Sequence, residues 1–330
     1  MIWLTWRQMR AQTLWTAGVL AAIGAYLLYL AAAVRESYRV NVTECTTACD
    51  EAAHLFGDEF GSGLLMLGLL LLAGPALIGA FWGAPLITRE LETGTHRLVW
   101  NQSVTRTRWL AVKLVIVGGV SVLFTGTLSL LLTWAAGPYD KLVDSRFEPL
   151  TFAARDLAPF GYAILAFTLG LVIGVLVRKT LAAMALTLVA FVVFQLLMAN
   201  VLRPHFTEPV TETITWADAN TVGQIDAFGI GSEGAGIQEY QIQGAWVLDD
   251  LITVYKGDGT AFDESDLDTC DAQGATTPDE CLRAMDATFD VTYHPADRYW
   301  TFQWIELGGA LALSAVLLGV AFWRIPRGIN

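Results

Sequence analysis

Six long apolar stretches alternate with polar segments along the chain, and this pattern predicts a protein that crosses a membrane six times. A helix needs about 20 apolar residues to cross roughly 30 Å of hydrocarbon at about 1.5 Å per residue. Each of the six stretches reaches that length with a modest tilt. The predicted spans cover residues 13–34, 62–83, 110–135, 158–177, 180–202 and 301–323.

The polar block at residues 203–298 follows a different pattern. Short alternating runs at 245–248 and 252–255 predict β-strands. A threonine, a proline and two acids at 277–280 predict the start of a helix. The glycines at 229–236 predict a flexible loop. The block is therefore expected to form a small mixed α+β domain between the fifth and sixth spans.

The first residues of the chain mix tryptophans and arginines at helical spacing. This mixture predicts an amphipathic helix in the membrane interface, although these residues also suit the first turns of the first span. No cleavable signal peptide is expected, because the first span is too long. The expected fold class is an all-α polytopic membrane protein with a small α+β domain. The expected divisions are 1–12 (interfacial helix), 13–202 (five spans, with an inner loop at 84–109), 203–298 (the polar domain) and 299–330 (the sixth span and tail).

Basic residues set the expected orientation, since Lys and Arg collect in the short loops that face the cytoplasm. With both termini inside, the inner segments hold eleven basic residues and only two acids, Glu90 and Glu92. The acidic block 203–298 then lies outside the cell. The net charge of −12 is concentrated there, which argues against a nucleic-acid partner.

All four cysteines fall on the predicted outer side. Two are four residues apart, Cys45 and Cys49, and two are eleven apart, Cys270 and Cys281. An oxidising exterior favours one disulfide within each pair, with free thiols as the alternative. Zinc is not expected, because the spacings do not match a zinc site and no histidine lies close to either pair.

Enzymatic chemistry finds little support in the chain. It lacks the Walker A pattern GxxxxGK[ST], HExxH and GxSxG, so neither a nucleotide site nor a catalytic or metal site is expected. The ionisable residue inside a span is Glu306, close to its end, where a functional role and a solvated structural role are equally open. An antiporter would place acids near the midplane of the membrane, and this chain places none there.

Two features of the spans concern packing or transport. Phe191, Gln195 and Met198 share one face of the fifth span, with Phe194 nearby, and such a face suits either a path for an amphipathic substrate or ordinary helix packing. In the fourth span the pattern GxxxG at 170–174 permits close contact between helices, although it is common by chance.

The inner loop carries the most distinctive polar pattern. Its short segment joins two spans and orders its charges as acids, a glycine and then basic residues, which suits a helix that docks into a groove of a partner. In the second span, Pro75 lies near the middle and predicts a kink in that helix. The residues expected to couple to the partner are Arg89, Glu90, Glu92, Gly94, Thr95, Arg97, Arg106 and Arg108.

The run from 87 to 113 reads ITRELETGTHRLVWNQSVTRTRWLAVK. It resembles the inner loop of ABC type-2 exporter permeases, in which Glu-x-x-x-Gly-Thr is followed by a Ser/Thr-Arg pair and a basic third span. The six-span plan and the outer insertion before the last span are similar as well. Block 203–298 is larger than the outer segment typical of that family, so its role does not carry over.

The resemblance implies a permease subunit of an ATP-driven exporter. It implies a location in a bacterial plasma membrane. It also implies two ATP-binding subunits on the inner loops, which hold ATP and Mg²⁺, and a second permease chain. A homodimer is expected, and a heterodimer with a related permease is the open alternative. The path between the two halves then involves Pro75, Phe191, Phe194, Gln195 and Met198. Few charges in the spans favour lipophilic or amphipathic cargo such as a drug, antibiotic, peptide or lipid, as in multidrug resistance. The alternative is a membrane sensor, or mechanotransmission protein, with a ligand-binding outer domain.

Overall fold

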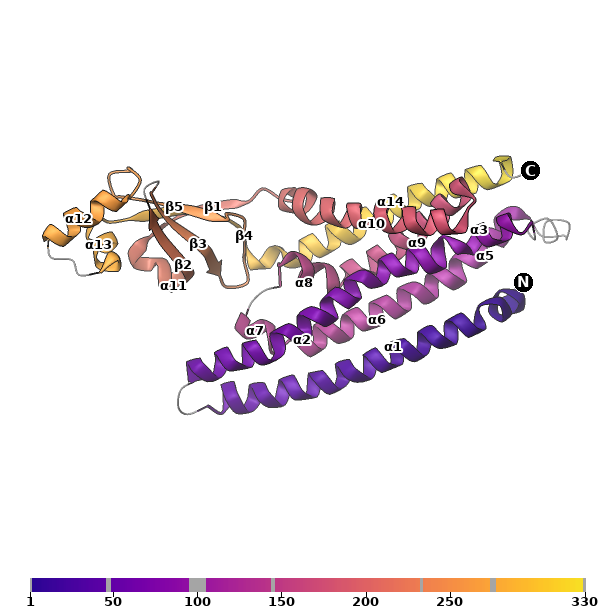
Figure 1. Cartoon of the computed structure of the whole chain (residues 1–330), viewed down its shortest axis with the longest axis horizontal. Coiled ribbons are helices and arrows are strands. Elements are labelled where there is room, and N and C mark those ends of the chain that lie inside the picture. The colour runs from indigo at the N-terminus through magenta and orange to yellow at the C-terminus, as the bar shows by residue number, and fades with distance from the viewer. Residues whose placement is uncertain are drawn as a thin grey trace. The chain divides into compact units, whose positions relative to one another are not determined.

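The computed structural model describes residues 2–45, 49–94, 105–143, 146–231, 234–273 and 277–328. Within these residues, six helical segments are long and apolar enough to cross a membrane, which confirms the six predicted spans. The chain forms two compact units (Figure 1). The helical unit comprises Met1–Arg203 and Phe302–Asn330, and the sheet unit comprises Pro204–Thr301.

The spans are longer than the hydropathy pattern predicts, because helix continues into the flanking polar residues. The fourth is the exception, since its helix has the predicted bounds. Several spans are built from α-helix joined to a π-helical turn, which adds one residue per turn. The main helices are α1 (Ile2–Tyr38), α2 (Cys49–Ile78), α3 (Pro85–Glu92), α5 (Arg106–Lys113), α6 (Gly119–Ala136), α9 (Ala158–Val177), α10 (Thr180–Leu197) and α14 (Tyr299–Gly328). The π-helical turns are Arg39–Thr43, Gly79–Gly83, Leu114–Gly118 and Met198–Leu202.

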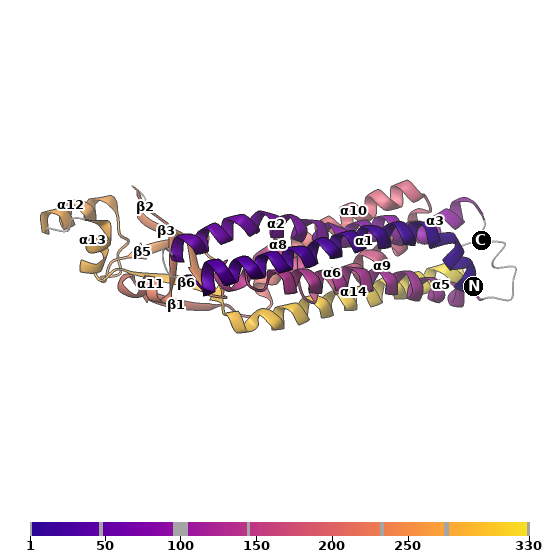
Figure 2. The same cartoon turned by 90° about the horizontal axis from the view of Figure 1, so that it is seen from below.

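In the helical unit, α1, α2 and α6 lie side by side, as both views show (Figures 1 and 2). Two short helices, α7 (Asp140–Val143) and α8 (Pro149–Ala154), follow α6. α8 packs against α2 and α9. Helix α9 has most of its length buried and contacts α2, α3, α6 and α10. Its central position explains why it is apolar on all sides rather than on one stripe.

The N-terminal helix differs from the expectation. α1 continues without a break from Ile2 to Tyr38, so residues 1–12 do not form a helix separate from the first span. Their position at the membrane surface stays a prediction.

The sheet unit has six strands in the order β1-β6-β5-β3-β2, and β4 also pairs with β6. All of these pairs are antiparallel, and Phe289 and Val254, both fully buried, lie in the core beneath them. The strands are β1 (Val210–Thr215), β2 (Gly223–Gly231), β3 (Gly234–Ile242), β4 (Trp246–Val247), β5 (Leu251–Tyr255) and β6 (Thr288–His294). The helices of this unit are α11 (Ala219–Val222), α12 (Glu264–Gln273) and α13 (Pro278–Ala284).

Local signals located several of these elements correctly. The strands predicted at 245–248 and 252–255 correspond to β4 and β5. Thr277 caps α13 by accepting a hydrogen bond from the backbone N–H of Glu280, as the helix-start pattern predicts. The flexible loop predicted at 229–236 is wrong, because Gly229 and Gly236 pair across the β2–β3 hairpin.

Both expected disulfides are present in the structure. Cys45 bonds to Cys49 in the helical unit, and Cys270 bonds to Cys281 in the sheet unit. The second bond joins α12 to α13 and lies in the core of its unit, where both cysteines are almost fully buried. It therefore links the two short helices within that core.

Candidate functional site

The predicted coupling segment begins with α3, directly after the π-helical turn of the second span. Proline stands at the first position of α3, where a missing N–H costs no helical bond. Gly94 follows the helix with a φ of +71°, a left-handed conformation that glycine adopts without strain. Thr95 and Arg97 lie outside the described residues, as do 98–104.

The returning segment is α5, which starts at Arg106. Thr105 caps it by accepting a hydrogen bond from the backbone N–H of Arg108 at 3.3 Å. Arg108 is exposed, and the side chain of Arg106 lies outside the described residues. The predicted basic residues therefore stand at the first turn of the helix that leads into the third span.

Glu90 binds the third span. Its Oε1 lies 2.5 Å from the Nζ of Lys113, which also donates to the backbone oxygen of Leu86 at 3.2 Å. Both charged side chains are largely buried, with 7% of Lys113 and 16% of Glu90 exposed. A buried pair of opposite charges is held firmly, because separating it leaves an uncompensated charge. The pair thus fixes α3 to the base of the third span.

Glu92 binds the start of the fifth span. Its carboxylate accepts the backbone N–H of Thr180 at 2.9 Å and the hydroxyl of Thr180 at 2.5 Å. The ordinary cap position, Lys179, provides no side-chain cap, so Glu92 caps α10 from a different helix. A carboxylate there also interacts favourably with the positive end of the helix dipole.

The glycine face of α9 brings α3 close to the centre of the bundle. A Cβ atom on Gly174 would lie 2.8 Å from the backbone oxygen of Ala84, just before α3. A Cβ atom on Gly170 would lie 2.2 Å from the backbone oxygen of Gly79. The glycines of α9 therefore permit the predicted close contact between helices. Helix α9 supports α3 in addition to the contacts that α3 makes with α5 and α10.

The predicted charged segment is therefore divided in its roles. Glu90 and Glu92 face other helices of this chain and hold α3 in place. Arg89 and Arg108 are exposed. The described surface of this connection therefore offers these two basic side chains to a docking partner, together with the exposed Glu92, whose carboxylate already binds Thr180.

Two of the residues predicted to line a substrate path, Phe191 and Phe194, pack against α9 within this chain. Phe191 is fully buried, and its ring lies edge-on to that of Tyr162, with centroids 6.1 Å apart. Phe194 makes a similar contact with Tyr162. Met198 and Pro75 are buried as well. These contacts support the packing interpretation, and a role in a path between two chains stays a prediction.

Gln195 behaves differently from its neighbours on α10. Its Nε2 atom is buried, and no hydrogen-bond partner for it occurs among the described residues. A buried amide without a partner is costly, particularly where the helix crosses hydrocarbon. Gln195 is therefore the residue of this face whose position packing alone does not explain.

Sequence reasoning missed a buried polar cluster at the other end of the helical unit. Arg203 and Glu306 form a two-point ion pair with both side chains fully buried. Gln303 accepts the backbone N–H groups of Leu157 and Ala158 and so caps α9. The solvated role considered for Glu306 is wrong, because Arg203 covers it. The sequence signal for this pair was that one ionisable residue lies near one end of the fifth span and another lies near one end of the sixth.

His294 fastens the two ends of the sheet unit to one another. Its Nε2 lies 3.0 Å from the backbone oxygen of Pro204, where the unit begins. Its Nδ1 lies 3.2 Å from the guanidinium of Arg298, where the unit ends. The carbonyl accepts and the guanidinium donates, so the geometry requires a neutral ring with its proton on Nε2. Burial lowers the pKa of His294 and the charge of Arg298 lowers it further, while the hydrogen bond with Pro204 offsets part of the shift.

Acidification is expected to loosen this contact. The folded-state pKa of His294 lies below the ordinary value near 6.5, so the unfolded chain takes up the proton first. Stability of the sheet unit should be constant above about pH 6.5 and fall below it, by at most about 1.4 kcal/mol per pH unit. Hydrogen exchange of the β1 and β6 amides in the full chain, between pH 7.5 and 5, measures this. His294→Gln, which cannot titrate, should lose the dependence, and an identical profile in both proteins would contradict the assignment.

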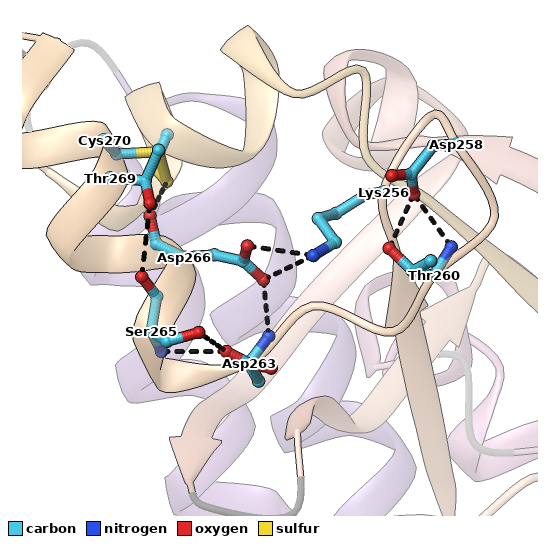
Figure 3. Close-up of polar contacts among 9 residues, drawn as sticks. Lys256, Asp258, Thr260, Asp263, Ser265, Asp266, Thr269 and Cys270 are labelled. Atoms are coloured by element: carbon cyan, nitrogen blue, oxygen red, sulfur yellow. Dashed lines mark hydrogen bonds and ion pairs between the residues drawn. A yellow bond between two sulfur atoms is a disulfide. The ribbon is translucent and has the colours of Figure 1, made fainter.

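Acidic residues also gather before and within α12 (Figure 3). Lys256 donates to both oxygens of Asp266 at 2.9 Å, and the carboxylate of Asp263 caps the helix by accepting from Ser265. These hydrogen bonds raise the pKa of Lys256 and lower that of Asp263. Within the described residues, no group of three or more His, Cys, Asp or Glu side chains is placed to hold a metal ion. The cluster therefore orders the loop.

A comparison with known protein families gives a match that covers most of the helical unit. A family model described as "ABC-2 membrane transporter related" matches residues 17–203, which is more than half of the chain. That region contains five of the six spans and the whole connection between α3 and α5. No curated protein and no solved structure matches the chain.

Proposed function

The chain belongs to the family of ABC-2 related membrane transporter proteins, and from this membership we propose that it is the permease half of an ATP-driven exporter. It is a multi-pass membrane protein, and a permease of this family works with a separate ATP-binding subunit. We propose two such subunits per complex, which bind ATP and Mg²⁺, together with a second copy of this chain. The termini and the α3–α5 connection then lie in the cytoplasm of a bacterium, and the sheet unit lies outside.

The attachment of α3 to two spans carries the proposal. Glu90 holds the third span through Lys113, and Glu92 holds the fifth span through Thr180. A push on α3 would therefore be transmitted to both spans: the contact between Glu90 and Lys113 is largely buried, and the exposed carboxylate of Glu92 binds the first residue of α10 through two hydrogen bonds. This is the property that a coupling element between a motor subunit and a transport path requires.

The surface of the connection supports a particular kind of contact. Arg89 and Arg108 are exposed and free to meet an acidic groove of the ATP-binding subunit, where charge complementarity sets the register of docking. Thr95 and Arg97 lie in the same segment and belong to the proposed contact. The cargo is proposed to be lipophilic or amphipathic. Its path would run between the two permease chains, beside Pro75 and Gln195.

Glu92→Gln is expected to uncouple ATP hydrolysis from transport. The amide keeps the size of the side chain but loses the charge that caps α10, and hydrogen bonds to a charged acceptor are stronger than those to a neutral one. Transport per ATP hydrolysed should fall roughly tenfold, while the ATP-binding subunit still co-purifies, because Arg89 and Arg108 are intact. Reconstituted vesicles containing both subunits allow the two rates to be measured together. Thr180→Val should give the same phenotype from the other side of the contact.

Glu59→Gln is the matched control, since Glu59 is an exposed acid at the opposite end of the same span. It should leave both rates unchanged. The double variant Arg89→Ala, Arg108→Ala should instead lose the ATP-binding subunit. A chain that purifies from its host without any ATPase, or with a kinase, would overturn the permease assignment in favour of the sensor. Unchanged coupling in Glu92→Gln would overturn only the role of Glu92.

A further inference from the structure

A cavity of about 200 Å³ lies in the helical unit between α2 and the segment that contains α7 and α8. None of its residues belongs to the connection between α3 and α5 or to the predicted substrate path. One wall is apolar and comes mostly from α2, and the other is polar and comes from the segment after α6. The lining residues are Gly61, Leu64, Leu65, Gly68, Tyr139, Glu148, Leu150, Thr151 and Arg155.

Arg155 brings unused hydrogen-bond donors to the cavity. It follows the last residue of α8, is 5% exposed, and donates to Asp140, which is its one acceptor among the described residues. A guanidinium has five N–H donors, and the nitrogens of Arg155 that do not bind Asp140 are not sealed from solvent. The remaining donors therefore suit a ligand with anionic oxygens, such as a phosphate.

Glu148 places a negative charge at the opposite end of α8. It precedes the helix and accepts a hydrogen bond from the hydroxyl of Thr151 at 3.2 Å. Seven residue steps separate it from Arg155, which corresponds to about 10 Å along a helix. Burial raises the pKa of Tyr139, so its phenol stays neutral and keeps its O–H donor. The cavity thus presents a cation and an anion at two separate positions, with a neutral donor on its wall.

The position along α2 corresponds to the level of lipid head groups. Residues 60–88 contain no ionisable side chain, and at about 1.5 Å per residue they span about 43 Å. This matches the full thickness of a bilayer with its head groups, about 40–45 Å. Gly61 and Leu65 lie in the first part of this stretch, at the end away from Arg89. Exposed apolar side chains, including Met66 and Leu69, continue from the cavity along α2.

We propose that this cavity binds the head group of a zwitterionic phospholipid, with the phosphate at Arg155 and the ammonium at Glu148. The acyl chains then lie along the exposed leucines of α2. Charge decides the class of ligand. A purely anionic head group would be repelled by Glu148, and a purely cationic head group would be repelled by Arg155. This site is independent of the proposed coupling to an ATP-binding subunit.

Native mass spectrometry of the full chain, after delipidation and addition of defined lipids, tests the proposal. Phosphatidylethanolamine should be retained roughly tenfold more than phosphatidylglycerol, which has a phosphate and no ammonium. Leu65→Trp narrows the cavity from its exposed wall and should lower retention of phosphatidylethanolamine by a similar factor. Met66→Trp is the control, because Met66 is exposed beside Leu65 and does not line the cavity. Arg155 is left intact, since its removal would strand the buried Asp140.

Glu148→Gln distinguishes recognition of the head group from a merely structural role. The variant should lose the preference for phosphatidylethanolamine while it still retains phosphatidylglycerol. Equal retention of the two lipids by the unmodified chain would overturn the proposal, and so would unchanged retention in Leu65→Trp. Full displacement of the lipid by millimolar phosphoethanolamine, which has the head group and no chains, would overturn the lipid as occupant and indicate a site for a free zwitterion.

Discussion

Gly170→Ala is expected to prevent stable packing of the second span against the fourth. The added Cβ atom would lie 2.2 Å from the backbone oxygen of Gly79 and 2.9 Å from the backbone nitrogen of Ala84. Both are backbone atoms, so no side chain can rotate away, and the helices have to separate. Overpacking a well-packed interior costs about 1–3 kcal/mol or more, and this contact belongs at the upper end. Thermal unfolding of the detergent-solubilised chain, followed by size-exclusion chromatography, measures the loss.

Gly119→Ala and Gly309→Ala are the matched controls. Both glycines lie in membrane helices, and a Cβ atom on either would meet no other atom within 4 Å. Alanine is the better helix former by about 1 kcal/mol, so these variants should unfold at the same temperature as the parent or higher. Gly170→Ala with the melting temperature of the parent would show that the fourth span is not packed as described.

Hydropathy and short motifs predicted those parts of the fold that depend on neighbouring residues. The six spans were predicted correctly, because each buries a continuous apolar stretch in hydrocarbon. The strand at 252–255 and the helix start at Thr277 also depend on local sequence. The glycines of 229–236 misled, since a glycine run also suits a hairpin in which Gly229 lies opposite Gly236.

The side-chain partners could not be predicted, because they depend on how each helix is rotated about its axis. Glu90 and Glu92 stand two residues apart, yet one binds the third span and the other binds the fifth. The sequence indicated a charged segment and left open which charges face outward. Arg203 and Glu306 are 103 residues apart, and nothing local to either one indicates the other.

Removing either partner of the Arg203–Glu306 pair is expected to destabilise the helical unit strongly. Arg203 donates to both carboxylate oxygens, at 3.1 and 3.0 Å, and its guanidinium carbon lies 4.2 Å from the centre of the Phe152 ring. Both side chains are fully buried, so Arg203→Leu or Glu306→Leu leaves a buried charge without its oppositely charged partner. Breaking a buried pair in this way costs about 3–5 kcal/mol. Thermal unfolding in detergent again gives the measurement.

The double variant Arg203→Leu, Glu306→Leu separates the energy of the pair from the cost of an isolated charge. Two apolar side chains of suitable size leave no buried charge, and such replacements are often neutral or stabilising. The double variant should therefore be more stable than either single variant. As a control in the sheet unit, Arg283→Ala removes an exposed ion pair with Asp279 and should lower the free energy of unfolding by less than about 1 kcal/mol. If the two single losses simply add in the double variant, each residue acts alone. Recovery instead means that most of each single loss is the cost of leaving one buried charge unpaired.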